Sequence, residues 1–189
     1  MKEEKTEMAI TIIRHGKVDM QWRQWCTSEQ FDKDCSNYDS SPICLIDEKI
    51  EKNIEDDIYI STLKRSRETA EQLFGEKEFI ESDLLNEVPL RSCMDCKISL
   101  PLWFWNILGR LQWMLGSNRQ LEGKKETRKR AKQLIERLLL EDKNCILISH
   151  GFFMGTLVNE LKQYGFTIGK RKQRFSNLER IIAEKKGKL

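Results

Sequence analysis

Two apolar runs in the sequence end in the same way. Residues 8–13 (MAITII) lead into His15, residues 144–149 (NCILIS) lead into His150, and a glycine follows each histidine. A short, nearly continuous apolar run is typical of a strand buried on both faces, as in a parallel sheet covered by helices. The chain has no other histidine. The sequence therefore predicts a buried sheet that places both histidines at the ends of its strands.

Strand and helix signals alternate along the rest of the chain. Further strands are expected at 56–61, at 78–88 and, as a last edge strand, at 176–184. Helices are expected at 61–74, 120–143 and 151–165. The first helix would begin at Ser61 or Thr62, which are both good N-cap residues, and end at Gly75. The second carries an apolar stripe for packing on a sheet, made of Ala131, Leu134, Ile135, Leu138 and Leu139.

This order of elements predicts the α/β class, with a mostly parallel sheet and helices on both faces. Two stretches fit the pattern poorly, 20–55 and 98–118, and both are rich in tryptophan. They are expected to rise above the sheet as a small cap and to form the wall of a pocket. A chain of 22.4 kDa is expected to fold as a single domain over residues 1–189.

The composition favours a globular protein of the cytoplasm. Residues are 39% hydrophobic and 33% charged, no apolar run approaches a membrane span, and the first residues lack the apolar core of a secretory signal. No membrane partner is therefore expected, and the six cysteines are expected to be reduced thiols. Cys93 and Cys96 have the spacing of half a zinc site or of a redox pair. Because the sequence holds no second such pair, no metal is expected.

The C-terminal stretch is basic. Residues 170–189 hold eight lysines and arginines against two glutamates. Such a tail could contact nucleic acid or a membrane surface, or it could be a solvated edge. It offers no aromatic platform beyond Phe175, so no nucleic-acid partner is expected.

The residues around the histidines favour a site for a dianion. Ligands of an open α/β sheet bind beyond the carboxyl ends of its strands, where both histidines are expected. Arg14 precedes His15 directly, and Arg65 lies in the first turn of the helix after residues 56–61. Guanidinium groups offer paired donors to phosphate oxygens, and the helix that follows Gly151 adds N–H groups and a favourable dipole. An imidazole in such a pocket is a competent nucleophile toward phosphorus.

The sequence resembles the histidine phosphatase superfamily, which is also called phosphoglycerate mutase-like. Four motifs occur in the order and spacing of that family, and together they span residues 8–158. They are Arg14-His15-Gly16, residues 61–70 with Arg65, Thr69 and Ala70, residues 85–90 with Glu87, and residues 147–154 with His150-Gly151.

The resemblance implies a three-layer α/β/α sandwich with an inserted cap and a role for each motif residue. His15 would be the nucleophile that becomes phosphorylated, and Arg14, Arg65 and His150 would complete the phosphate pocket. Glu87 would donate a proton to the leaving group and then activate water. Gly16, Lys17 and Gly151 would contact the substrate. No metal or organic cofactor would be needed, the partner would be a small phosphorylated substrate, and inorganic phosphate would be the product.

Departures from the mutase branch favour a phosphatase. The asparagine that touches phosphate in that branch is absent, with Gln21 near its position, and the tryptophan-rich residues 98–118 replace a Gly- and Trp-Glu-rich stretch. Small bacterial members whose first motif reads RHGK are more similar. A phosphomonoester phosphatase is therefore expected. The alternatives are a mutase-type phosphotransferase and a binder of phosphorylated ligands without turnover.

Some residues keep two interpretations. Lys17 could bind an acidic group of the substrate or be a solvated lysine at the rim. Glu87 could be a surface carboxylate, in which case Asp19 is the reserve candidate for the proton donor. Three tryptophans could form an aromatic wall for a substrate or simply pack within the cap, namely Trp103, Trp105 and Trp113.

Overall fold

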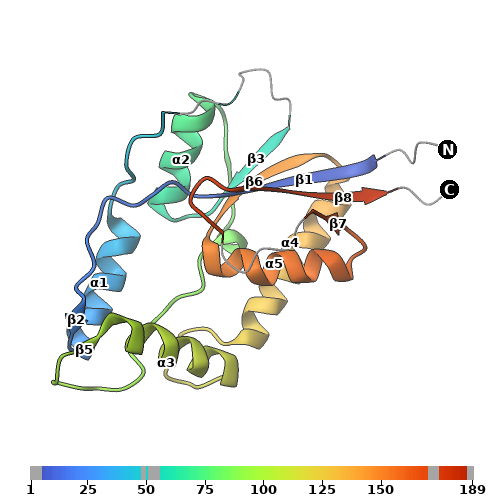
Figure 1. The fold of residues 1–189 in the computed structure, drawn as a ribbon. Coiled ribbons are helices and arrows are strands. Elements are labelled where there is room, and N and C mark those ends of the chain that lie inside the picture. The colour runs from blue at the N-terminus through green and yellow to red at the C-terminus, as the bar shows by residue number, and fades with distance from the viewer. Residues whose placement is uncertain (1–5, 48–49, 51–55, 170–174, 187–189) are drawn as a thin grey trace.

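A computed structural model of the chain describes residues 6–47, 50, 56–169 and 175–186. In this part of the chain, the main sheet has strand order β4-β3-β6-β1-β8-β7 (Figure 1). Four strands are parallel, namely β1 (Thr6–Arg14), β3 (Asp57–Ile60), β4 (Ile80–Glu81) and β6 (Cys145–Ser149). Strand β8 (Arg180–Lys186) runs antiparallel to both of its neighbours, β1 and β7 (Thr167–Ile168). The α/β class with a mostly parallel sheet is confirmed.

Helices cover both faces of this sheet, as predicted (Figure 1). Helix α2 (Lys64–Phe74) packs on one face, and α4 (Lys124–Glu141) and α5 (Gly151–Gln163) pack on the other. Strand β1 shows why its sequence is apolar throughout. Its Ile13 packs under α2, whereas Ile10 and Ile12 pack under α4 and α5. Burial on both faces therefore explains the absence of alternation in residues 8–13.

The two stretches that fitted the sheet pattern poorly lie together, away from the sheet (Figure 1). One carries β2 (Trp25–Cys26) and α1 (Ser28–Ser40), and the other carries β5 (Leu100–Pro101) and α3 (Leu102–Leu115). Strand β2 pairs with β5 in antiparallel fashion and so joins the two stretches. We call these four elements the cap. The part of 20–55 at 48–49 and 51–55 lies outside the described residues.

The cap has its own small core, which settles the role of its tryptophans. Trp105 is fully buried, its ring centroid lies 5.9 Å from that of Phe31, and its Nε1–H donates to the Cys26 carbonyl at 3.0 Å. Trp103 is 62% exposed on the outer face of α3. Trp113 packs against Phe152 and donates to Thr127. None of the three tryptophans lines the main cleft described below, so they do not form its wall.

The start of α2 differs from the prediction. The helix begins at Lys64 after the N-cap residue Leu63, three residues beyond Ser61. Neither predicted cap residue is free to act as one. The Ser61 hydroxyl bonds the His150 ring, and the Thr62 hydroxyl and backbone N–H both bond the Asn86 side chain. Tertiary contacts thus override a good local capping signal.

Two predicted strands are also corrected. Residues 78–88 form a strand only at Ile80–Glu81, because the 3-10 helix η1 (Asp83–Leu85) follows at once. Strand β8 begins later than residue 176, and it is not an edge strand because β7 pairs with its outer side. The basic residues at 170–174 and 187–189 lie outside the described residues.

No helix of the described residues is both long enough and apolar enough to cross a membrane. All six cysteines are free thiols, including Cys93 and Cys96. Burial raises the pKa of the Cys93 thiol.

Candidate active site

The two histidine-glycine steps meet at one edge of the sheet. Strands β1 and β6 are parallel neighbours, with Arg14 paired to Ser149, and the His15 backbone N–H donates to the Ser149 carbonyl at 3.0 Å. The rings of His15 and His150 lie 5.0 Å apart between centroids, and both residues are buried. The sequence prediction that strand ends bring these residues together is therefore confirmed.

The hydrogen bonds of His15 define its tautomer. Its Nδ1 lies 2.7 Å from the Gly16 carbonyl oxygen. Because a carbonyl can only accept, Nδ1 carries the proton and Nε2 keeps its lone pair. Burial lowers the pKa of His15 to about 3, and the charges of Arg65 and Arg14 add to this effect. His15 is thus a neutral imidazole with a free Nε2, which is the form that a nucleophile requires.

The turn after His15 is fixed from two sides. The Gly16 backbone N–H donates to Thr69 Oγ1 at 2.9 Å, and the Asn177 side chain donates to the carbonyls of His15 and Gly16 at 2.9 and 3.2 Å. A Cβ on Gly16 would lie 3.0 Å from Ile43 Cδ1, so the position suits glycine. These contacts hold the His15 backbone in one place.

Arg65 and His150 form a second part of the site. Arg65 Nε donates to His150 Nδ1 at 3.1 Å, so the His150 proton resides on Nε2, which faces Ser61 Oγ at 2.7 Å. Burial, reinforced by Arg65, lowers the pKa of His150 well below its ordinary value. His150 is therefore also neutral. The charge of this site comes from its guanidinium groups.

Arg14 lies against the beginning of α5. Its Nη1 donates to the Phe175 carbonyl, whereas its Nε is buried and has no hydrogen-bond partner in the described residues. A Cβ on Gly151 would lie 2.9 Å from this Nε, so glycine is what allows the close approach. Arg14 Nε thus lies against the beginning of α5 as a donor without a partner in the described residues.

Glu87 contacts the same helix end. Its Oε2 accepts from the Phe152 N–H at 3.1 Å, and its Oε1 accepts from the N–H groups of Phe153 and Val88, each at 2.9 Å. Glu87 is therefore not a loose surface carboxylate. These contacts hold both carboxylate oxygens against the beginning of α5.

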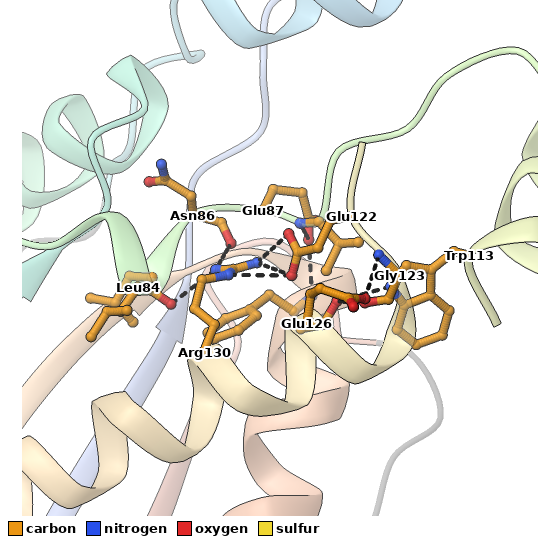
Figure 2. Close-up of polar contacts among 12 residues, drawn as sticks. Leu84, Asn86, Glu87, Trp113, Glu122, Gly123, Glu126 and Arg130 are labelled. Carbon is orange, nitrogen blue, oxygen red and sulfur yellow. Dashed lines mark hydrogen bonds and ion pairs between the residues drawn. The ribbon is translucent and has the colours of Figure 1, made fainter. Parts of the chain in front are cut away.

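Arg130 of α4 supports the segment that carries Glu87. Figure 2 shows its guanidinium between the Glu122 carboxylate and two main-chain carbonyls, those of Leu84 and Asn86. The Nη1 distances to these carbonyl oxygens are 2.9 and 2.7 Å. The guanidinium also lies 4.3 Å from the centre of the Phe153 ring. Arg130 thus ties residues 84–86 to the helix end that holds the Glu87 carboxylate.

A cleft of about 1380 Å³ joins this site to the cap. Its walls include the pocket residues Arg14, Arg65, Glu87 and Gly151, together with Tyr38, Asp39 and Arg110 from the cap. Asp39 Oδ1 accepts from Arg65 Nη1 at 2.7 Å. The Tyr38 ring lies 5.0 Å from the Arg65 guanidinium and 6.4 Å from the His15 ring.

Two residues predicted near the site do not line this cleft. Lys17 and Asp19 are exposed, and neither is among the residues that line the cleft. Their segment runs along residues 42–44, because the Asp19 N–H donates to the Pro42 carbonyl and the Cys44 N–H donates to the Lys17 carbonyl. This pairing holds residues 17–19 against residues 42–44.

The sequence prediction missed the residues that the cap and the C-terminal segment bring to the site. They are Tyr38, Asp39, Arg110 and Asn177. The first two sit at the end of a polar stretch, and Arg110 is a single arginine in an apolar helix. Of these residues, Arg110 alone could have been found from the sequence. A single charge in an apolar segment needs a polar environment, and this indicates a site.

Fold and site together define an α/β protein with a neutral, buried histidine close to a cleft whose walls carry Arg14 and Arg65. A family model described as the histidine phosphatase superfamily (branch 1) matches residues 10–185. The chain belongs to this superfamily. No curated protein sequence gives a match.

Solved structures share the fold at low sequence identity. A mycobacterial glucosyl-3-phosphoglycerate phosphatase is similar with a TM-score of 0.60 and 14% identity, covering 92% of this chain and 88% of its own. A phosphoserine phosphatase mutant from Entamoeba histolytica, in complex with phosphoserine, has a TM-score of 0.55 and 18% identity, covering 93% and 89%. An alpha-ribazole phosphatase from Shigella flexneri has a TM-score of 0.53 and 17% identity, with the same coverage. These likenesses agree with the fold described above.

Proposed function

We propose that this protein is a phosphatase that hydrolyses a phosphomonoester through a phosphohistidine on His15. One observation carries the proposal. His15 is neutral and buried, its Nδ1 proton is committed to the Gly16 carbonyl, and its Nε2 is unprotonated in the electrostatic field of Arg14 and Arg65 beside His150. A nucleophile with a fixed tautomer next to guanidinium donors is the arrangement that phosphoryl transfer to nitrogen requires.

The reaction proceeds in two displacements. Nε2 of His15 attacks phosphorus with its lone pair, the bond from phosphorus to the ester oxygen breaks, and the alcohol leaves after gaining a proton. Water then attacks the phosphohistidine, loses a proton and releases inorganic phosphate, which restores neutral His15. Arg65 and the buried Arg14 Nε would hold the phosphoryl oxygens in both steps.

Glu87 is our candidate for the proton donor and, in the second step, for the base that activates water. Its position on the cleft wall beside the first turn of α5 supports this role. Its contacts with backbone N–H groups hold the carboxyl group in one orientation on the cleft wall, as both steps require. Asp19 is a weaker candidate because it is exposed and apart from the cleft.

We further propose that the reaction needs no metal and that the substrate is a small phosphorylated metabolite. The guanidinium groups supply the positive charge that a divalent ion would otherwise provide. The similar structures include enzymes named for phosphoserine and glucosyl-3-phosphoglycerate, which are small phosphorylated compounds. Six free cysteines support a cytoplasmic location, and the β2–β5 pairing supports one capped domain over the chain.

A screen of phosphorylated metabolites in the presence of EDTA tests this proposal. Release of inorganic phosphate is expected, together with acid-labile, alkali-stable phosphate on the peptide that contains His15. Phosphate trapped on serine or cysteine would contradict the mechanism. Transfer to a second hydroxyl in place of water would indicate a mutase, and phosphate binding without any turnover would indicate a binder.

A further inference from the structure

We infer that this protein forms a homodimer through the outer side of helix α3, which packs antiparallel against α3 of a second copy. Five residues of the helix are exposed, and all five are large and apolar. They are Trp103, Ile107, Leu111, Met114 and Leu115, which are between 41% and 73% exposed. We call these five residues the α3 face. Single exposed apolar residues are normal, whereas a helix that exposes only such residues marks a binding surface.

The α3 face forms a continuous stripe along one side of the helix. Its residues follow one another at intervals of four, four, three and one, which at about 100° per residue keeps them within roughly a third of the helix circumference. The other side is occupied by the cap core, where Trp105 and Gly109 are buried. Figure 1 shows α3 at the edge of the molecule, away from the sheet. No residue of the α3 face lines the main cleft, so a partner on this face leaves the cleft walls free.

The exposed area is close to what a stable dimer needs. Trp25 of β2 extends the α3 face, because Trp25 and Trp103 line the same hollow. With Trp25 included, the exposed parts of these side chains amount to roughly 750 Å², since a large side chain offers about 150–250 Å² for burial. A standard interface buries ~800 Å² on each partner. This surface is therefore large enough for an interface between two copies.

The α3 face is complementary to itself. The hollow beside Trp25 and Trp103 has a volume of about 360 Å³ and lies at the beginning of α3. At the other end of the helix, Leu115 is the most exposed residue of the face. When two such helices cross antiparallel about a two-fold axis, Leu115 of each copy lies near the hollow of the other, and Ile107 meets Leu111 at the centre. One surface thus supplies both the projecting side chain and its recess, as an isologous interface requires.

The charge of α3 favours a second copy over a membrane surface. A helix that lies in a membrane interface carries lysines and arginines beside its apolar face, and these attract anionic head groups. The one charged residue of α3 is Arg110, which lines the main cleft and stacks on Phe152. A second α3 face is equally uncharged, so pairing the two faces removes no charged group from water.

Sedimentation velocity over a range of protein concentrations tests the inference. The wild type should sediment as a dimer at about 20 µM and above, as expected for an interface of this size. Leu111→Lys places a charge at the centre of the interface in both copies, and it should weaken association by at least about a hundredfold. A wild type that is monomeric even at about 200 µM overturns the inference.

Leu140→Lys is the matched control, because Leu140 is an exposed leucine of α4 outside the α3 face. This variant should dimerise like the wild type. Circular dichroism and thermal melting should show that both variants are folded, as expected for substitutions of exposed residues. A dimer that persists in Leu111→Lys overturns the inference, and so does an equal loss of the dimer in Leu140→Lys.

Oxidation of methionine by hydrogen peroxide gives a second measurement that needs no substitution. Met114 belongs to the α3 face and Met94 does not, and the two are 51% and 42% exposed. In the dimer, Met114 should be oxidised at least about threefold more slowly than after dilution to the monomer, whereas Met94 should react equally in both. Equal rates for Met114 in dimer and monomer would show that another surface forms the dimer, and this overturns the inference.

Vesicles distinguish a second copy from a lipid surface as the occupant. Cosedimentation can be compared for vesicles of phosphatidylcholine alone and for vesicles with about one third phosphatidylglycerol. The wild type should stay in the supernatant with both. Binding of a monomer to the anionic vesicles, with loss of that binding in Leu111→Lys, would assign the α3 face to a membrane surface and overturn the inference.

Discussion

Asp39 Oδ1 accepts a hydrogen bond from Arg65 Nη1 at 2.7 Å, so a carboxylate of the cap contacts the arginine that faces the phosphate pocket. The Arg65 side chain is 1% exposed, whereas that of Asp39 is 54% exposed. The arginine is thus fixed and the carboxylate can move. A bound phosphate must share Arg65 with this carboxylate or displace it.

Asp39→Asn should therefore tighten the binding of phosphate. The amide keeps the side-chain shape but removes a negative charge next to the bound dianion. We expect the inhibition constant of inorganic phosphate to fall about three- to tenfold, since screening by solvent limits the effect of an exposed charge. Asp95→Asn is the control, because it disrupts an aspartate–arginine pair that is not part of the cleft wall. Weaker phosphate binding in Asp39→Asn would mean that Asp39 positions Arg65 for the ligand.

Arg65→Ala should reduce kcat/KM far more than Lys17→Ala. Arg65 is buried on the cleft wall and bonded to His150, whereas Lys17 is exposed and apart from it. We expect a loss of at least about a hundredfold for Arg65→Ala and about tenfold or less for Lys17→Ala, or roughly 2.7 against 1.4 kcal/mol in the barrier. Steady-state kinetics on one phosphomonoester measures both. If Lys17→Ala lost more kcat/KM than Arg65→Ala, the assignment of Arg65 to the phosphate would be wrong.

The pKa of His15 predicts how stability depends on pH. Burial lowers this pKa from its ordinary value of 6.5 to about 3. Between these values the unfolded chain binds a proton at His15 that the folded chain does not bind. The free energy of unfolding should therefore fall as the pH falls through this window. His150 contributes in the same direction because its pKa is also lowered.

His15→Gln should weaken that dependence. Urea unfolding at about pH 7.5 and about pH 5 measures the change in free energy for the wild type and for the variant. The change should be smaller in His15→Gln and should not vanish, because His150 remains. Equal changes in both proteins would show that His15 is protonated in the folded state.

Glu87→Gln should show whether Glu87 donates a proton to the leaving group or only holds the beginning of α5. If Glu87 protonates the leaving oxygen, the variant should slow hydrolysis of alkyl phosphates by about a hundredfold and affect p-nitrophenyl phosphate far less, because that leaving group needs no proton. The amide oxygen can still accept from the first turn of α5 at one of the two positions, whereas the amide NH2 cannot accept at the other.

Parallel losses on both substrates would assign Glu87 to holding α5 and not to proton transfer. Asp19→Asn serves as the comparison, since Asp19 is exposed and apart from the cleft. Loss of alkyl phosphate turnover in Asp19→Asn, with Glu87→Gln unaffected, would reverse the assignment of the acid.

The sequence by itself determined the sheet and the position of both histidines. Residues 8–13 and 144–149 are apolar without alternation because both faces of β1 and β6 are covered, and this pattern is visible locally. Parallel neighbours end at the same edge, so Arg14, His15 and His150 had to meet. The four motifs that occur in the order of the family also predicted Arg65 and Glu87 as residues of the site.

Only the tertiary structure decided which cap residues reach the site and where local signals fail. Tyr38, Asp39 and Arg110 lie on helices whose orientation depends on the β2–β5 pairing and on Trp105 packing against Phe31, and no local pattern encodes that packing. Ser61 is a good N-cap by type, yet the His150 ring engages its hydroxyl. Strand periodicity is a property of neighbouring residues. The contacts of a polar side chain depend instead on segments that are distant in the sequence, and only folding brings these together.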